Sequence, residues 1–337
     1  MTSDILVTGG TGTLGRPVVR RLQEAGREVR VLSRRSREAG EGIEYVTGDL
    51  ATGEGIEAAV DGAEIIVHCA GSNKGDEDKA RNLVRAAAPA GARHLVYISV
   101  VGADRIPVVS GADRAMFGYF ASKLAAERVV ADSGLPWTTL RATQFHDLIL
   151  LVAQQMVKLP VIPVPAGFRF QPVDAGEVAD RLVELTLGSP AGLAPDIAGP
   201  RVYTVPGLLH PYLRARGKRR PMVPVPIPGK AAHAVRAGAN LAPERAVGHR
   251  TWEDFLDERV LSQACAAGYS PVTGPSPGHS RCLVRGCGYE RSRKRPGAAV
   301  RRRLGGRLRR SGRMGAAGGG SHQRCAGQTR SGRPLSA

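Results

Sequence analysis

Residues 4–15 read DILVTGGTGTLG, a short apolar run that leads into a turn with four glycines. The glycines satisfy two overlapping spacings, G-x-G-x-x-G from Gly10 and G-x-x-G-x-x-G from Gly9. Residues 14–25 continue with apolar side chains at helical intervals, so the segment predicts a strand, a turn and a helix. Glycines in such a turn let the backbone approach a pyrophosphate, and the N–H groups that open the helix attract its oxygens. We therefore predict a dinucleotide site formed by Gly9, Gly10, Thr11, Gly12, Thr13, Leu14 and Gly15.

The same pattern repeats along the first half of the chain. Strand patterns occur at residues 28–32, 43–46, 64–68, 94–99 and 137–140, and helical patterns occur at 56–60, 79–88 and 120–133. Strands that alternate with helices form parallel sheets with right-handed crossovers. We predict an α/β fold for residues 1–150, a Rossmann-type doubly wound parallel sheet that binds NAD(P).

Beyond Leu148 the alternation of strands and helices stops, and proline becomes frequent. Helical patterns are found at residues 175–187, 231–237 and 251–260, a strand pattern at 202–205, and an extended proline-rich connector at 221–228. Fewer and shorter strand patterns are typical of an accessory region rather than of a second large sheet. We predict that residues 151–260 form a smaller substrate or lid region at the edge of the sheet.

The last part of the chain, residues 261–337, differs sharply in composition. It contains sixteen Lys and Arg residues and one acid, Glu290, so it carries fifteen of the eighteen net positive charges and leaves three for residues 1–260. With two aromatic residues it cannot bury enough apolar surface to offset its ordering entropy, and we expect a disordered tail. An arginine-rich tail binds phosphates without sequence selectivity, which is one interpretation. We favour another, that the tail is frameshift-derived, because nothing organises its charge; nucleic acid is then not a partner beyond non-specific tail binding.

The lengths of the apolar stretches and the positions of the cysteines indicate the general class of protein. No basic and apolar leader precedes the first strand pattern, and the longest apolar stretch, residues 148–153, is far shorter than a bilayer span of about 18 residues. Of the five cysteines only Cys69 lies before residue 261, and the tail cysteines lack partners at zinc spacing. We expect a cytoplasmic protein with no membrane partner and no metal site.

The choice between the two nicotinamide cofactors depends on the end of the second predicted strand. NAD is held by an acid about 20 residues after the glycines, whereas the 2′-phosphate of NADP requires a cation. Here the strand ends in Ser33-Arg34-Arg35, and the first acid is Glu38. Arginine matches a phosphate through its planar, permanently charged guanidinium. We predict that Ser33 and Arg34 bind NADP(H) in preference to NAD(H), which stays possible.

In chain order, the motifs resemble those of atypical short-chain dehydrogenase/reductases of the NmrA-like branch. They are the turn at residues 8–15, Gly48-Asp49-Leu50, Cys69-Ala70-Gly71, Tyr97-Ile98-Ser99, and residues 119–123 and 140–145. The resemblance covers about residues 3–260. It implies that Asp49 and Leu50 contact the adenine and that Ala70 and Gly71 lie along the ribose. It also implies that the nicotinamide end is lined by Ala142, Thr143 and Gln144.

Tyr119 and Lys123 form the Tyr-x-x-x-Lys pair to which the resemblance assigns the chemistry. On a helix, positions i and i+4 share a face, so both side chains can point into one cleft. An ammonium beside a phenol favours the phenolate, so we expect Tyr119 to have a pKa below its usual value of about 10 and to exchange protons near neutrality. The resemblance also implies that Lys123 holds the nicotinamide ribose. Ser99 is the candidate for positioning a substrate carbonyl, although the residues leave open whether it bonds only to backbone.

These residues favour an NADP(H)-dependent oxidoreductase that acts on a small carbonyl or quinone-like substrate by hydride transfer, with Tyr119 as proton donor or acceptor. A first alternative is a non-catalytic NADP(H) sensor of the NmrA-like type, which would bind a protein partner. A second is a nucleotide-sugar epimerase or dehydratase, against which Arg34 argues because such enzymes retain NAD. Neither the substrate nor the oligomeric state can be predicted from the sequence, because fold does not determine function.

Overall fold

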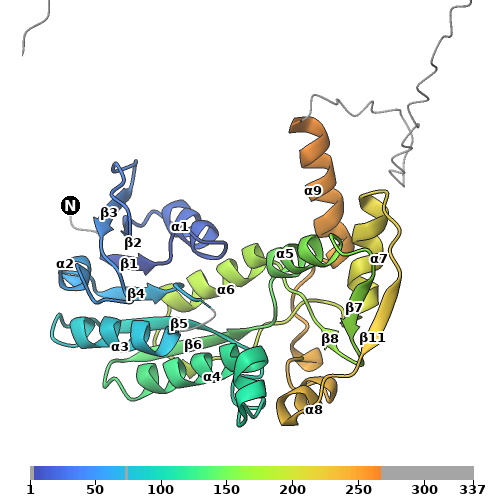
Figure 1. Cartoon of the computed structure of the whole chain (residues 1–337). Helices are drawn as coiled ribbons and strands as arrows, with labels where there is room; N and C mark the ends of the chain where they lie inside the picture. The colour runs from blue at the N-terminus through green and yellow to red at the C-terminus, as the bar shows by residue number, and fades with distance from the viewer. Residues whose placement is uncertain (1–3, 73–74, 267–337) are drawn as a thin grey trace, which may run out of the picture. The chain divides into compact units, whose positions relative to one another are not determined.

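The computed structural model describes residues 4–72 and 75–266, which belong to one compact unit, Met1–Thr273 (Figure 1). The last described element extends past residue 260 to Ala266. The predictions made for the basic tail, including its disorder and its origin, lie outside the described residues.

A parallel sheet of seven strands forms the first half of the fold, in the order β3-β2-β1-β4-β5-β6-β9. The strands are β1 (Ile5–Thr8), β2 (Val29–Ser33), β3 (Ile43–Thr47), β4 (Ile65–His68), β5 (His94–Val100), β6 (Trp137–Ala142) and β9 (Gly192–Leu193). The chain order reverses between β1 and β4, and ligands bind outside the carboxyl ends of the strands at such a switch point. The predicted Rossmann-type doubly wound sheet is confirmed.

Helices cover both faces of this sheet (Figure 1). On one face lie α1 (Gly15–Glu24) and α6 (Ala175–Leu187), and on the other lie α2 (Ile56–Val60), α3 (Asp76–Ala87) and α4 (Gly111–Ala131). Alternate residues of a strand point to opposite faces. In β1, accordingly, Ile5 and Val7 are buried in the apolar cluster with α1, whereas Leu6 is buried in the cluster with α3.

Helix α4 begins well before the predicted start at residue 120. Ser110 Oγ accepts a hydrogen bond from Asp113 N at 3.0 Å, and the Asp113 carboxylate accepts one from Ser110 N at 3.1 Å. This reciprocal capping box satisfies N–H groups that open the helix, so it fixes the start at Gly111. The additional turns place Tyr119 in the middle of the helix rather than before it.

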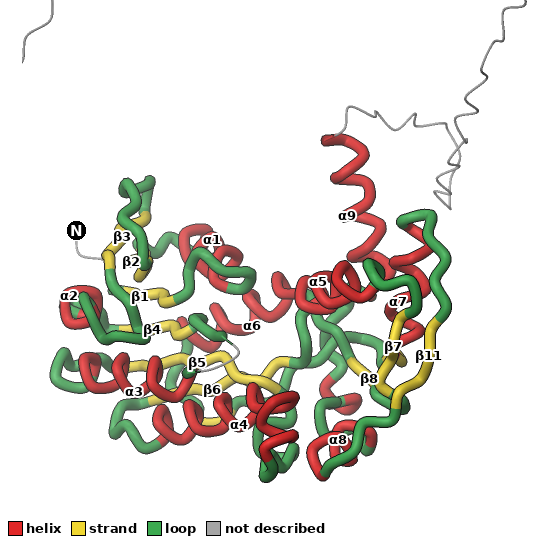
Figure 2. Tube along the Cα trace, in the orientation of Figure 1, coloured by secondary structure: helices red, strands yellow, loops and turns green. Residues whose placement is uncertain are grey.

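The remaining elements form a second region around its own apolar cluster, in which Trp252 and Phe255 are buried. They are α5 (His146–Met156), β7 (Ile162–Pro165), β8 (Arg169–Phe170), β10 (Tyr203–Thr204), α7 (Val205–Ala215), β11 (Met222–Val225), α8 (Lys230–Arg236), a 3-10 turn at Pro243–Arg245, and α9 (Trp252–Ala266). β11 pairs parallel with β7, and β10 pairs antiparallel with β8. Figure 2 shows these short strands among helices and long loops.

Two helices of this region were not predicted from the sequence, α5 and α7. The apolar side chains of α5 surround the helix instead of marking one buried stripe, and α7 contains Pro211. The predicted strand at 202–205 is cut short because Thr204 Oγ1 accepts from Gly207 N at 3.1 Å and caps α7. Among the described helices none is long and apolar enough to span a bilayer.

Candidate functional site

The glycine turn brings the ends of β1 and β4 into contact. Gly9 has φ +70°, and a Cβ atom placed there would lie 2.6 Å from Ala70 N. A Cβ at Gly15 would lie 2.1 Å from Gly9 O, so α1 starts directly against the turn. α1 has no side-chain N-cap and no acid in its first turn. The turn therefore offers a narrow backbone cradle with a helix N-terminus that is suited to an anion.

A cavity of about 340 Å³ opens beside this turn, at the switch point of the sheet. Nine of the predicted cofactor residues line it, namely Gly9, Thr11, Gly12, Ser33, Arg34, Asp49, Leu50, Ala70 and Gly71. Leu32, Gly48, Ala51, Cys69, Ser72 and Lys79 complete the wall. The glycine cradle, the cationic side chain at one end and the backbone of two loops fit a dinucleotide.

Other residues of the turn act through packing instead. A Cβ at Gly10 would lie 2.8 Å from a methyl group of Val31, so Gly10 lets α1 approach β2. Leu14 is buried in the core, and Thr13 is exposed outside the cavity wall. The sequence pattern thus marks the turn as a whole, and the structure separates its packing positions from those that line the cavity.

Arg34 lies at the end of β2 and is exposed on the cavity wall. Ser33 Oγ donates to Arg35 O at 2.8 Å, which folds the loop after the strand. Within the described ranges, 4–72 and 75–266, Arg34 has no acidic partner. Its guanidinium is therefore available to an anionic ligand.

Lys123, although predicted to bind the cofactor, does not line the cavity: its side chain is almost fully buried behind Gly71, which does. Its Nζ donates to Tyr97 Oη at 3.3 Å and to Ile98 O at 3.1 Å, and it forms an ion pair with Asp76 Oδ2 at 3.2 Å. A Cβ at Gly71 would lie 3.3 Å from this Nζ. The ammonium thus lies directly below the glycine that the resemblance assigns to the ribose.

The positive charge of Lys123 and the negative charge of Asp76 balance each other within this buried group. Burial lowers the pKa of Lys123, but Tyr97 and Asp76 outweigh it and hold that pKa above its ordinary value. Burial raises the pKa of Asp76, and Lys123 and a hydrogen bond from Ser72 bring it below its ordinary value. Lys123 and Asp76 are therefore both charged near neutrality.

The uncharged ring of His68 packs against the same group of buried side chains. Its ring stacks on Tyr97 with the centroids 5.3 Å apart, and Nδ1 lies 2.7 Å from Thr8 Oγ1. Burial, followed by the charge of Lys123, lowers the pKa of His68 to about 3. Tyr97, which has burial as its main influence, has its pKa raised to about 12. Neither side chain changes its charge near neutral pH.

Tyr119 shares a helix face with Lys123, as predicted, and the Lys123 Nζ lies 5.9 Å from the centre of its ring. The expected lowering of the Tyr119 pKa is not found. Burial, followed by the negative charge of Asp76, raises this pKa above its ordinary value. The ammonium of Lys123 is already bonded to Asp76 and Tyr97, so its effect on Tyr119 is weak. Tyr119 is therefore a protonated phenol at neutral pH, which is a proton donor.

Three unpaired polar atoms lie at the carboxyl ends of β5 and β6: Ser99 Oγ, Thr143 Oγ1 and Gln144 Oε1. Each is buried and has no hydrogen-bond partner among the described residues. Ser99 thus does not bond to the backbone, the alternative that the sequence left open. Ala142 is packed in the apolar core beside them. Because buried polar groups are normally hydrogen-bonded, a polar ligand group at these strand ends would supply the partners that the three atoms lack.

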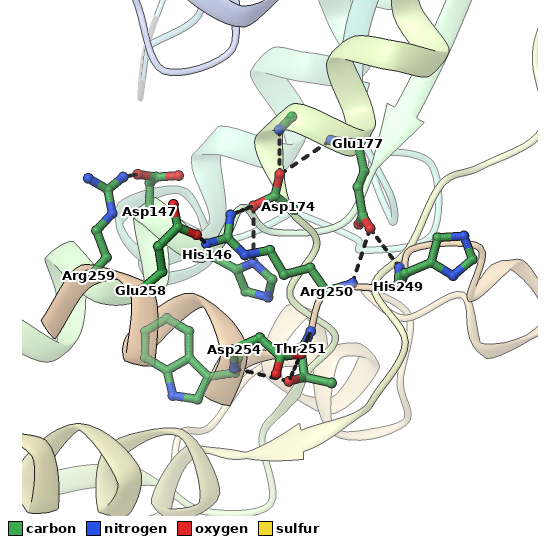
Figure 3. A network of polar contacts seen from close by, with 12 residues as sticks. His146, Asp147, Asp174, Glu177, His249, Arg250, Thr251, Asp254, Glu258 and Arg259 are labelled. Atoms are coloured by element: carbon green, nitrogen blue, oxygen red, sulfur yellow. Dashed lines mark hydrogen bonds and ion pairs between the residues drawn. The ribbon is translucent and has the colours of Figure 1, made fainter. Parts of the chain in front are cut away.

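His146 and Asp147, which follow Phe145 at the start of α5, point to separate partners (Figure 3). The buried ring of His146 stacks on Phe255 of α9 and lies 4.0 Å from Asp174 Oδ2. Asp147 accepts from Arg259 at 2.6 Å. The two residues fasten α9 to α5 and α6, so they do not form a catalytic pair in the cleft.

Comparison with known proteins identifies related sequences. A family described as NAD(P)H-binding matches residues 9–155. The (4-alkanoyl-5-oxo-2,5-dihydrofuran-3-yl)methyl phosphate reductase of Streptomyces griseus subsp. griseus is 31% identical over 207 residues, which are 59% of this chain and 69% of the relative. The NAD(P)H azoreductase of Xenophilus azovorans is 29% identical over 58% of this chain and 68% of its own. A protein of Mycobacterium tuberculosis is 27% identical over 66% of this chain, but this match spans only 24% of the relative.

Solved structures share the fold. An NADPH-dependent quinone oxidoreductase of Escherichia coli, in complex with NADPH, superposes with a TM-score of 0.64 at 19% identity, over 76% of this chain and 99% of its own. The Citrobacter sp. triphenylmethane reductase in complex with NADP(H) gives a TM-score of 0.60 at 20% identity, over 77% and 99%. With the glycine turn and the switch-point cavity, the family match and the Streptomyces relative establish the family: the chain belongs to the NAD(P)H-binding family that includes these reductases.

Proposed function

We propose that the protein is an NADP(H)-dependent oxidoreductase that reduces a small carbonyl or quinone-like substrate. The observation that carries the proposal is the position of Tyr119 on the same helix face as the buried Lys123, whose Nζ lies 5.9 Å from the centre of the phenol ring. The unpaired Ser99 hydroxyl at the end of β5 supports it, because a hydroxyl without a partner is available to a substrate oxygen.

Tyr119, Ser99 and Lys123 have separate roles in the proposed reduction. The bound nicotinamide supplies the hydride in this chemistry. Tyr119 donates its proton to the substrate oxygen, and its raised pKa keeps it protonated until that oxygen gains negative charge. Ser99 donates a hydrogen bond to the same oxygen. Lys123 keeps a positive charge beneath the ribose region, which favours the negative charge that develops in the transition state.

The preference for NADP(H) is assigned to Arg34. Its guanidinium lies on the cavity wall beside Ser33 and has no acidic partner in the part of the chain that the structure describes. A planar guanidinium forms paired hydrogen bonds to a phosphate, so it favours the 2′-phosphate over a 2′-hydroxyl.

An apolar substrate is favoured by the helix that follows the nicotinamide end. Leu148, Leu151 and Val152 of α5 are exposed and share one helix face. Phe120 of α4, next to Tyr119, and Ile149 of α5, next to Leu148, pack against the same apolar cluster. This cluster therefore connects α5 with the helix that carries Tyr119. An exposed apolar face of this kind favours a hydrophobic ligand. Among the relatives is a ceramide reductase of Caulobacter vibrioides, whose name describes a lipid substrate.

The test is turnover of NADPH by the full chain with a panel of carbonyl and quinone acceptors. The variant Tyr119→Phe should lose roughly 100-fold or more in kcat, the usual contribution of a positioned acid, with unchanged NADPH affinity. Tyr203→Phe is the matched control, because it also removes a phenol hydroxyl, one that donates to Glu253 at 2.7 Å in the second region. Full activity of Tyr119→Phe would remove Tyr119 from the mechanism. Cofactor binding without turnover on any acceptor would instead favour the sensor function.

A further inference from the structure

The buried ion pair below the cavity floor joins two helices that the sequence does not connect. Asp76 is the first residue of α3, and Lys123 lies in α4; their charged atoms are 3.2 Å apart. Both side chains are almost fully buried. The second oxygen of Asp76 accepts from Ser72 N at 2.8 Å and lies 3.2 Å from Lys79 Nζ. Asp76 thus connects Lys123 to two residues, Ser72 and Lys79, that line the cavity.

Stability alone does not explain why the protein contains this buried ion pair. Removing two charges from water costs more than their attraction commonly returns, and apolar residues of similar size often stabilise a protein as well or better. The pair lies where a Cβ at Gly71 would be 3.3 Å from Lys123 Nζ and 3.5 Å from Asp76 Oδ2. Its location at the cofactor cavity therefore gives the reason to retain it.

We propose that Asp76 is a positioning residue for Lys123. Its carboxylate holds the ammonium charged and fixed beneath Gly71, where the nicotinamide ribose lies in the proposed function on which this inference rests. Tyr97 Oη and Ile98 O occupy the other hydrogen bonds of the ammonium, so Asp76 is the one anion in direct contact with it among the described residues. Without Asp76, the buried ammonium would keep only two uncharged partners, Tyr97 Oη and Ile98 O.

The chain offers a matched control pair on the same helix. Glu127, one turn after Lys123 in α4, bonds to Arg141 of β6 at 2.6 and 2.9 Å, and both side chains are buried. Neither residue lines the cavity. Glu127→Gln therefore breaks a buried ion pair of α4 without touching Lys123, whereas Asp76→Asn removes the charge next to Lys123 at nearly constant shape.

The first measurement needs no turnover. Full-length protein with isotope-labelled lysine is examined by NMR at a series of pH values, and the chemical shift of the Lys123 ε-carbon gives the midpoint of its titration, with the exposed Lys158 as internal reference. The shift follows protonation of a buried amine without a reagent that must reach it, so the midpoint follows the pKa of Lys123. Asp76→Asn should lower the Lys123 midpoint by at least one pH unit, about a tenfold change in the neutral fraction. Glu127→Gln should leave it unchanged, and Asp76→Glu should restore most of the shift.

The second measurement is turnover. Asp76→Asn should lower kcat by about tenfold, because the ammonium stays charged at neutral pH but loses the contact that fixes it in place, and Asp76→Glu should recover part of the activity. An unchanged Lys123 midpoint in Asp76→Asn, or an equal shift in Glu127→Gln, would overturn the inference. If Asp76→Asn does not fold, wild-type protein still decides, because a Lys123 midpoint at or below that of Lys158 contradicts a charge held by Asp76. Absence of turnover in the wild type refutes the proposed function and leaves the result of the Lys123 titration intact.

Discussion

Replacing Gly9 by alanine tests whether the glycine turn is built for close approach of backbone. Gly9 has φ +70°, and its Cβ would lie 2.6 Å from Ala70 N and 2.7 Å from Ala70 Cα. The left-handed conformation alone costs an L-residue about 1–2 kcal/mol. The steric overlap adds to this cost, since both neighbours are backbone atoms and the loops after β1 and β4 must separate. Gly9→Ala should therefore lose cofactor binding as well as stability.

Gly26→Ala is the matched control for this prediction. Gly26 has φ +74°, but a Cβ there meets nothing within 4 Å, so only the conformational cost of about 1–2 kcal/mol remains. Urea unfolding gives the stability of each variant, and fluorescence titration with NADPH gives its affinity. We expect Gly26→Ala to lower stability with unchanged affinity, and Gly9→Ala to lower both. Wild-type NADPH affinity in Gly9→Ala would refute the interpretation of this turn as the cofactor cradle.

Two further predictions concern charge. Arg34→Ala should weaken NADPH binding by about tenfold or more, since hydrogen bonds to charged groups contribute about 1.5–3 kcal/mol, and should leave NADH binding unchanged; an equal loss for both cofactors in titrations contradicts the role of Arg34. Burial raises the pKa of Asp174, but His146 and Arg250 outweigh burial and hold that pKa well below its ordinary value. The Asp174 carboxylate therefore stabilises the folded protein above about pH 4, and this stabilisation is lost as the pH falls through the pKa of Asp174 in the folded state. Urea midpoints of Asp174→Asn should accordingly fall less between about pH 5 and pH 2 than those of the wild type, and parallel pH profiles would exclude this linkage.

The sheet could be predicted because its signals are local. The six apolar strand patterns and the glycine turn correspond to β1 to β6 and to the cradle at Gly9. The helical pattern predicts a start of α4 that is too late, because Gly111 and Gly118 weaken the pattern, although Ser110 and Asp113 stand at capping-box spacing. β11 could not be foreseen, since among residues 4–72 and 75–266 it pairs with β7 alone.

The site was predictable in part for the same reason. The positions after the strand ends, such as Arg34 and Gly71, follow from topology and line the cavity. The protonation state of Tyr119 did not follow, because it depends on which group takes the charge of Lys123. That group, Asp76, lies 47 residues earlier in the sequence and has no motif of its own. Its only local signal is its place in the acidic first turn of α3, which a simple helix start also explains.

The two parts of the site therefore depend on different physics. The cradle at Gly9 is fixed by backbone conformation within one turn, whereas the Asp76 to Lys123 pair depends on how closely α3 and α4 pack on the sheet. The buried faces of both helices carry alanines, Ala80 and Ala126, in the cluster that they share with the sheet. Small side chains let helices approach each other closely, and this approach lets a short aspartate reach Lys123. Changes in this packing would thus move the ammonium relative to Tyr119 and leave the phosphate cradle unchanged.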